Sequence, residues 1–327
     1  MILTAGQIVT LATQQAHATG YTAQAAQFLN AILSDLCQTY DLAVARALYQ
    51  FNFNPGLVTN FGSGPYSLPV DYLRTSGSSG STGASRSAWW TLLGVPYMMI
   101  PCDLAEFDIQ VQQAGLQSYP WLWATDMSPF GIISVQDGNT HSNTTLDGLT
   151  TTAGFVVGQG VAGPGIVPGS TILAIPGGGT SVTLSTAALS TGAGAFMFGN
   201  QPLGYAYPPP SGSYPVSIRY QRLMPPLPLD VTGNLTAGAQ ATIPWFPNTR
   251  YLLKKLAGML MEQTDDDRAP LFIGEGSPQS PGADAILAKY LKMKDDDTNR
   301  AKTVQLDRRR FGQGRWSDLK NTKVLGW

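Results

Sequence analysis

The chain has 327 residues, a net charge of -1, 43% hydrophobic residues and only 13% charged residues. Aromatic residues make up 10% of it, which excludes a disordered chain, and the low charge argues against a general nucleic-acid-binding surface. Two distant cysteines, Cys37 and Cys102, exclude a cysteine-rich zinc site and a disulfide framework. The sequence also predicts no signal peptide and no membrane-spanning helix, so we expect synthesis and folding in a cytoplasm.

Two helices are predicted near the N-terminus. Residues 4–18 form a weak amphipathic pattern that Gly20 interrupts. From Thr22 a longer helix is predicted to about Tyr49, before the turn at Asn54, Pro55 and Gly56. This second helix is indicated by apolar residues three or four positions apart, namely Phe28, Ile32, Leu36, Tyr40, Val44 and Ala47 or Leu48.

The middle of the chain has the pattern of short strands. Residues 57–128 alternate apolar runs with Gly and Pro, which predicts a small antiparallel β unit with a flexible loop at Ser76–Ser85. The same pattern returns at Tyr214–Leu223. Between these regions, about Gly131–Phe198 is almost free of charge and rich in Gly, Thr, Ser and Val. We interpret it as an inserted, Ig-like β-sandwich module.

Helices return after residue 246. One opens at Pro247-Asn248-Thr249 and another at Ser280-Pro281, each followed by a helical apolar stripe. Because neither the first nor the last helices can bury their apolar faces alone, we expect them to pack together. The predicted fold is therefore α+β: a helical bundle from both chain ends, an antiparallel β domain, the inserted module and an extended C-terminal arm. The predicted boundaries are 1–55 for the N-terminal helices, 56–129 and 200–245 for the two segments of the β domain, 130–199 for the module, 246–302 for the C-terminal helices and 303–327 for the arm.

Catalysis is poorly supported. The two histidines, His17 and His141, lie in a weak helix and a polar loop, and no nucleophile elbow, Walker loop or zinc-protease motif occurs. The acidic triplets Asp265–Asp267 and Asp295–Asp297 lack the spaced ligands of a calcium loop and are typical of solvated turns, although a metal stays an open alternative. We therefore expect no enzyme and no cofactor.

The C-terminal end concentrates positive charge. Residues 1–245 hold ten acidic and five basic residues, whereas Arg300–Trp327 holds eight basic residues against Asp307 and Asp318. Its sequence RRRFGQGRWSDLKN interleaves arginines with aromatic residues, a composition that suits docking into a partner protein better than a solvated tail. At about 3.3 Å per residue, Thr303 to Trp327 reaches on the order of 80 Å.

Several segments resemble head-to-tail adaptor (connector) proteins of tailed bacteriophages, particularly short-tailed ones. The resemblance is carried by YSLPVDYLR, PYMMIPCDLAEFD, WLWATD, YPVSIRYQRLMPPL and PNTRYLLKKLAGMLMEQTDDD, and covers residues 1–128 and 200–327. GQGVAGPGIVPGSTILAI resembles a Gly/Thr-rich β module found in virion proteins, and this insertion departs from the simplest adaptors.

The resemblance implies a structural virion protein at the head–tail junction, assembled in the host cytoplasm. It implies a homo-oligomeric ring, commonly a dodecamer, between the portal protein and a downstream tail (nozzle) protein. The lumen would pass the genome, with transient and non-specific DNA contact. The residues we expect to anchor the arm on the portal are Arg308, Arg309, Arg310, Phe311, Arg315, Trp316 and Trp327.

Two other functions stay open. A receptor- or carbohydrate-binding tail protein would use the inserted module for recognition, but Gly131–Phe198 contains no Trp or Tyr with which to hold a sugar. A virion-associated hydrolase would need a catalytic constellation that the sequence does not supply. The adaptor is the function that the sequence favours.

Overall fold

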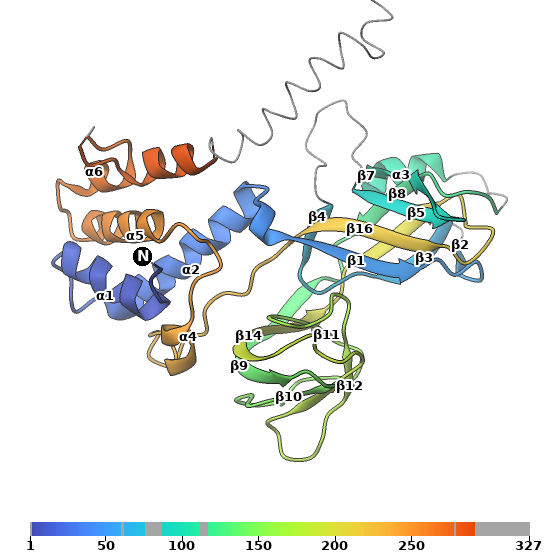
Figure 1. Cartoon of the computed structure of the whole chain (residues 1–327), viewed down its shortest axis with the longest axis horizontal. Coiled ribbons are helices and arrows are strands. Elements are labelled where there is room, and N and C mark those ends of the chain that lie inside the picture. The colour runs from blue at the N-terminus through green and yellow to red at the C-terminus, as the bar shows by residue number, and fades with distance from the viewer. Residues whose placement is uncertain (1, 60–61, 76–86, 112–116, 278, 292–327) are drawn as a thin grey trace, which may run out of the picture. The chain divides into compact units, whose positions relative to one another are not determined.

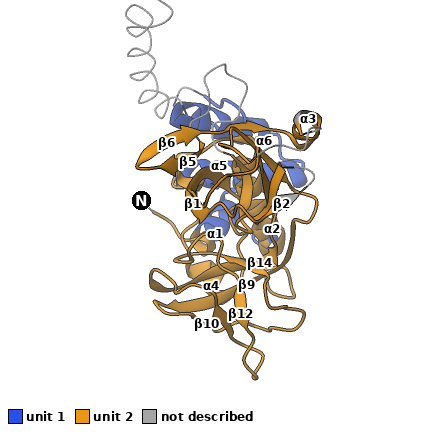
Figure 2. Cartoon of the chain, turned by 90° about the vertical axis from the view of Figure 1, so that its right-hand side faces the viewer, with its two compact units in different colours: residues 1, 8–21, 248–327 blue, residues 2–7, 22–247 orange. Residues whose placement is uncertain are grey.

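The chain is a mixed α+β protein with several antiparallel sheets (Figure 1). The computed structural model describes residues 2–59, 62–75, 87–111, 117–277 and 279–291. They form two compact units: one contains Ile8–Tyr21 and the residues from Asn248 onward, and the other contains Ile2–Gln7 and Thr22–Pro247 (Figure 2).

The described helices are mostly short. One of them spans residues 283–291. The remaining helices are α1 (Ala5–Gln15), α2 (Thr22–Thr39), the 3-10 turn η1 (Ala43–Ala45), α3 (Leu104–Gln110), α4 (Ala237–Ala241), α5 (Thr249–Gln263) and α6 (Ala269–Ile273). The predictions of a helix within residues 4–18 and of late helices after Pro247 and Pro281 are confirmed.

The first unit is held together around α5. Asn248 caps this helix, because its side-chain oxygen accepts from the Tyr251 backbone N–H at 3.1 Å. At Gly258, an added Cβ would come within 2.5 Å of Ile273 Cγ1, so only glycine lets α6 approach so closely. Lys255 Nζ lies 3.2 Å from Asp284, which connects α5 with residues 283–291. Ile8–Tyr21 and the late helices thus share one unit, whereas the bundle arrangement itself stays a prediction.

The second unit contains two five-stranded sheets, which we call the β domain. The first sheet has the order β1-β16-β5-β6, with β4 also paired to β16, and the second has the order β2-β3-β15-β8-β7. Their cores are aromatic, with Trp90, Trp123, Tyr72 and Tyr220 at most 1% exposed. The strands are β1 (Arg46–Asn52), β2 (Val58–Thr59), β3 (Gly62–Ser67), β4 (Tyr72–Thr75), β5 (Ala88–Leu92), β6 (Val95–Met98), β7 (Ile100–Cys102), β8 (Leu122–Asp126), β15 (Leu203–Tyr207) and β16 (Pro215–Arg222).

A six-stranded antiparallel sheet, which we call the inserted sheet, is spliced into the β8–β15 hairpin. Leu203 pairs with Asp126 across this hairpin, so the chain leaves and re-enters the β domain at adjacent positions. The inserted sheet has its own apolar core, in which Phe196 and Phe198 are fully buried. Its order is β11-β14-β9-β10-β13-β12, with β9 (Gly131–His141), β10 (Thr145–Asp147), β11 (Gly160–Ala162), β12 (Ile172–Ala174), β13 (Val182–Leu184) and β14 (Thr191–Asn200).

The prediction that the second helix continues to about Tyr49 is wrong. Helix α2 ends at Thr39, and Arg46–Asn52 form strand β1, which pairs with β16 along its whole length. The sequence RALYQFN also alternates with a period of two, and pairing with a distant strand decides between the two patterns. Helix α3 lies within the region expected to be only β and is a further departure from the predicted elements.

Side chains from outside α2 hold the place where this helix ends. Gln221 of β16 is fully buried and donates its Nε2 to the carbonyls of Cys37 at 2.7 Å and Tyr40 at 2.5 Å. In the middle of α2, the side chain of Asn30 exchanges two hydrogen bonds of 2.8 Å with the backbone of Leu227. The bond to Cys37 satisfies a carbonyl in the last turn of α2, and the bond to Tyr40 holds the residue that follows the helix, so β16 supports the end of α2.

Candidate functional site

The predicted portal-binding residues lie outside the described part of the chain. Their positions are Arg308, Arg309, Arg310, Phe311, Arg315, Trp316 and Trp327. The flexible loop predicted at Ser76–Ser85 lies outside it as well. Candidate sites within the described residues are therefore independent of the sequence prediction for the arm.

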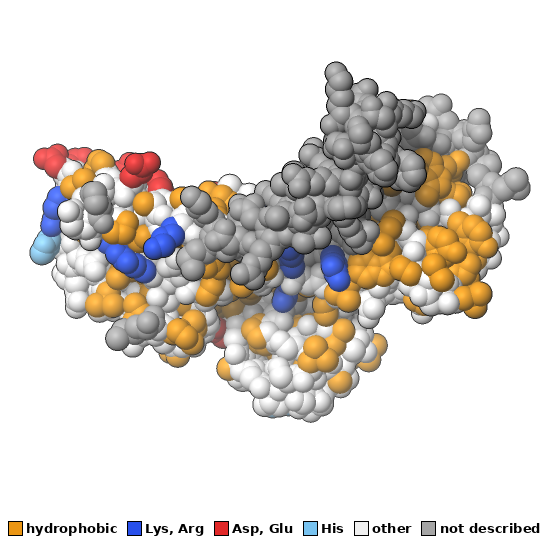
Figure 3. Space-filling view, turned by 45° about the horizontal axis from the view of Figure 1, so that its top comes forward, with side chains coloured by type: hydrophobic (Ala, Val, Ile, Leu, Met, Phe, Trp, Pro, Cys, Tyr) orange, Lys and Arg blue, Asp and Glu red, His pale blue; other side chains and the backbone are white. Residues whose placement is uncertain are grey.

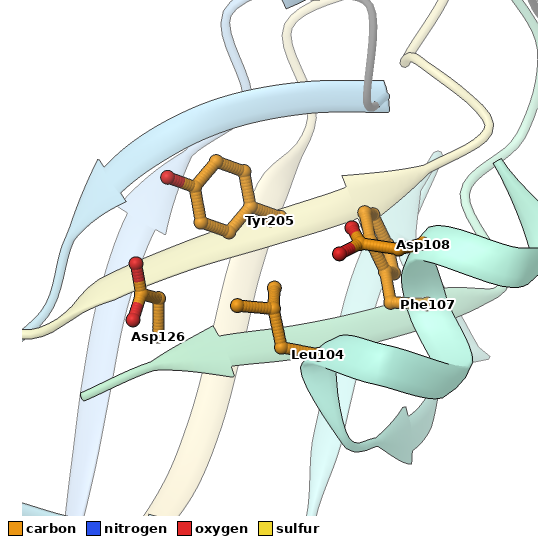
Figure 4. Close-up of a pocket in the computed structure, with 5 residues that line it drawn as sticks. All are labelled: Leu104, Phe107, Asp108, Asp126 and Tyr205. Atoms are coloured by element: carbon orange, nitrogen blue, oxygen red, sulfur yellow. The ribbon is translucent and has the colours of Figure 1, made fainter. Parts of the chain in front are cut away.

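A small pocket opens between α3 and the strands β8 and β15. Its volume is about 200 Å³, and it is lined by Leu104, Phe107, Asp108, Asp126 and Tyr205. Figure 4 shows the carboxylates of Asp108 and Asp126 on opposite sides, with the Tyr205 ring and the Leu104 side chain between them. We call this the carboxylate pocket.

Local interactions hold the side chains that line the carboxylate pocket in place. Asp103 caps α3, since its carboxylate accepts from the Glu106 N–H at 2.7 Å, and Phe107 anchors the helix in a core with Val111, Leu122 and Ala124. Phe107 is fully buried, so its neighbour Asp108 is turned outward along the rim. The chain thus presents one carboxylate from a helix and one from the end of a strand.

The charged side chains that line the pocket are both acidic. Burial, and then the charges of Asp126 and Asp108, raise the pKa of the Tyr205 hydroxyl, which therefore stays protonated and available as a donor. Asp126 accepts from the Ser128 N–H at 2.8 Å, and within the described residues neither carboxylate forms an ion pair. The arrangement suits a cation with an apolar stem.

A second candidate is a cluster of aromatic rings at the edge strand β6. Trp90 is buried beneath Tyr97 and Tyr119, with ring centroids 4.6 and 5.4 Å away and nearly parallel planes. Tyr97 and Tyr119 are themselves inclined by only 8° and are 43% and 54% exposed. Trp90 is fixed because its Nε1 donates to the Pro120 carbonyl at 2.8 Å. This aromatic platform presents two flat rings to solvent.

Hydrophobic side chains gather over the β domain (Figure 3). Leu93, on the turn between β5 and β6, is 95% exposed, and every residue of β6 is exposed. Pro96 lacks a backbone N–H and so limits β-strand addition at this edge. The surface is therefore suited to side-chain contacts with a partner.

The most buried charged group belongs to the framework. Asp71 has a 2% exposed side chain, accepts from the Tyr220 hydroxyl at 2.9 Å and pairs with Arg222 Nε at 2.5 Å. Burial, together with the charge of Asp71, raises the pKa of Tyr220. Every group in this cluster has a partner, so removing one would leave a buried polar group unpaired, and the cluster offers no reactive group.

The described acidic triplet, Asp265–Asp267, lines an open depression of about 640 Å³. Asp266 is paired with Arg268, whose hydrogen bonds lower the pKa of this carboxyl to about 2. Among the described residues, no group of three or more His, Cys, Asp or Glu side chains is arranged to hold a metal ion. Asp295–Asp297 lies outside these residues. Of the histidines, His141 Nε2 lies 2.9 Å from Asp147 at the surface of the inserted sheet.

Sequence reasoning missed both the carboxylate pocket and the aromatic platform. Asp103 and Glu106 form a capping signal for α3 that was present in the sequence. The meeting of Asp108 with Asp126 depends on α3 packing beside β8, which no local pattern reveals. Within the described residues no helix is long and apolar enough to cross a bilayer. No protein-family model and no curated protein matches this chain.

Proposed function

We propose that this chain is a ring-forming head-to-tail adaptor of a tailed bacteriophage, a structural component of the virion. Its C-terminal arm, residues 303–327, docks on the portal protein, and the opposite end of the ring receives a downstream tail protein. A dodecameric ring would leave a channel through which the genome passes with only transient, sequence-independent contact. The protein is assembled in the host cytoplasm and acts without catalysis or cofactor.

The observation that carries this proposal is the contrast in charge between the arm and the folded domains. Residues 87–218 contain six acidic residues and no Lys or Arg, whereas Arg300–Trp327 contains eight basic residues together with Phe311, Trp316 and Trp327. Arginine and aromatic residues contribute most of the binding energy of protein interfaces. A segment of this composition is best explained by docking on another protein.

Two features of the folded part are consistent with a ring. Residues from both chain ends share one unit, as the resemblance implies for an adaptor bundle. The β domain exposes Leu93, Val95, Ile100 and Trp121, which suit burial between subunits. The scarcity of basic residues on the β domain suits a lumen that lets DNA pass without tight binding.

Electron microscopy of the purified protein mixed with its portal tests this function. We expect a ring seated on the portal when both proteins are present, because the portal supplies the grooves in which the arm docks. A fibre-like trimer without portal contact would refute the adaptor.

A receptor- or carbohydrate-binding tail protein is the second candidate, and the aromatic platform favours it. The near-coplanar rings of Tyr97 and Tyr119 offer a flat surface on which the apolar face of a sugar can stack. Binding of the full chain to a glycan array, lost in Tyr97→Ala/Tyr119→Ala and retained in Tyr21→Ala, would support it. Tyr21 is a matched control because it is 39% exposed.

A further inference from the structure

The carboxylate pocket lacks a cation of its own among the described residues. Asp108 and Asp126 face one cavity, and neither forms an ion pair within the described residues. The nearest basic residues in sequence are Arg86 and Arg219, since residues 87–218 contain no Lys or Arg. Any basic group that neutralises the pocket must therefore come from another part of the chain or from another molecule.

The dimensions and walls of the pocket indicate a single side chain. Its volume of about 200 Å³ lies below the range of about 300–1,000 Å³ typical of small-molecule sites. Leu104, Phe107 and the Tyr205 ring supply apolar walls for a methylene stem, and the two carboxylates supply acceptors at the rim. Arginine matches both features, because its guanidinium pairs with carboxylates and stacks on aromatic rings while its stem packs against apolar groups.

The chain itself carries a segment of the matching chemistry. Residues 292–327 lie outside the described part, and this segment contains Arg308–Arg310 followed directly by Phe311. Ile109, which directly follows Asp108 on α3, is 66% exposed and offers an apolar surface for the phenylalanine. Charge and composition thus agree between the pocket and the arm.

We propose that, before the portal is present, the carboxylate pocket of one subunit holds an arginine of Arg308–Arg310 from a second copy of the chain. This inference rests on the proposed function, in which the arm is a docking segment. Every copy carries both pocket and arm, so the contact is heterologous, the kind of interface from which rings are built. The portal then competes for the same arginines and releases the arm from the neighbouring subunit.

The first test measures self-association of the full chain by sedimentation at several protein concentrations. We expect association that increases with concentration and weakens at high salt. Asp108→Asn/Asp126→Asn should reduce the association constant at least tenfold, and so should replacing Arg308–Arg310 by Gln. Asp35→Asn/Asp147→Asn removes the same charge from an exposed helix position and from the inserted sheet, and should have no effect.

A labelled peptide of residues 303–327 supplies a second measurement that does not depend on ring formation. Fluorescence anisotropy should show binding to the full chain, weakened at least tenfold in Asp108→Asn/Asp126→Asn. Asn keeps the acceptor for Ser128, and circular dichroism verifies that the variant is folded. Equal peptide binding by the variant and the control, or a full chain that is monomeric at all concentrations, would overturn the proposal.

A measurement of portal binding distinguishes a failure of this inference from a failure of the proposed function. Asp108→Asn/Asp126→Asn should bind the portal at least as well as the unchanged chain, since one competitor for the arm has been removed. If the variant loses self-association and keeps portal binding, the pocket acts as proposed. If the full chain does not bind the portal but still self-associates through the pocket, the adaptor fails while this inference stands.

Discussion

The inserted sheet and the β domain are both built mainly from antiparallel strands, yet their surfaces and cores differ. The inserted sheet has a core of aliphatic residues and phenylalanines, and Gly131–Phe198 contains no Trp, Tyr, Lys or Arg. The β domain has a core of Trp and Tyr, exposes further aromatic rings at β6, and carries the carboxylate pocket. The inserted sheet thus has an apolar core of its own, whereas the exposed aromatic rings and the carboxylate pocket lie in the β domain.

The largest expected effect tests the polar framework of the β domain. Asp71→Ala leaves the Arg222 guanidinium and the Tyr220 hydroxyl without their buried partner, and should lower the free energy of unfolding by about 3–5 kcal/mol. Urea unfolding followed by tryptophan fluorescence measures it, because the inserted sheet has no tryptophan. Asp147→Ala, which removes an exposed partner of His141, should change stability by less than about 0.5 kcal/mol. Equal effects would mean that burial of Asp71 is unimportant.

A smaller effect is expected inside the inserted sheet. An added Cβ at Gly163 would overlap the Phe196 ring, so Gly163→Ala should cost about 1–3 kcal/mol through overpacking. Gly192→Ala is the matched control, since no atom lies within 4 Å of its added Cβ. Urea unfolding followed by far-UV circular dichroism should show this loss of stability. The midpoint of unfolding followed by tryptophan fluorescence should stay unchanged. A joint shift of both signals would show that the two regions unfold as one.

The thiols give a further way to separate the two regions, because the inserted sheet has no cysteine. Burial raises the pKa of Cys102 to about 11, followed by the charges of Glu106 and Asp103. At pH 8 only about one Cys102 thiol in a thousand is therefore ionised, and burial also raises the pKa of Cys37. Alkylation should be slow in the native protein, faster in Asp71→Ala and unchanged in Gly163→Ala. Rapid alkylation of the unchanged protein would contradict the raised pKa values of the two thiols.

The smallest effect concerns removal of the inserted sheet. Because Leu203 pairs with Asp126, a short Gly/Ser linker in place of Gly131–Phe198 can close the β8–β15 hairpin. The deletion uncovers Val70, which packs on Ala162 and Met197, and should leave portal docking intact. Pull-down of the portal by the deletion variant measures docking. Loss of docking by a folded variant would place the inserted sheet in the interface with the portal.

Local patterns predicted the order of helical and β regions but not the contacts between distant segments. Strand β16 was visible from its alternation, and the asparagine cap of α5 from its position. Residues 46–49 fit both a helix and a strand, and the pairing of β1 with β16, about 170 positions away, decided between them. Likewise, Asp108 and Asp126 are brought together because α3 packs on β8, and their spacing in the sequence does not predict the pocket.

Portal affinity of the full chain and of its Trp316→Ala variant tests the central claim most directly. Tyr21→Ala is the control, since Tyr21 is an aromatic residue that is 39% exposed and lies outside the arm. An anchoring aromatic residue contributes about 2–4 kcal/mol, so Trp316→Ala should weaken binding by roughly 30- to 1,000-fold. The control should bind as the unchanged chain does. Unchanged affinity of the Trp316→Ala variant, with circular dichroism showing a native fold, would contradict the portal-binding role of the arm.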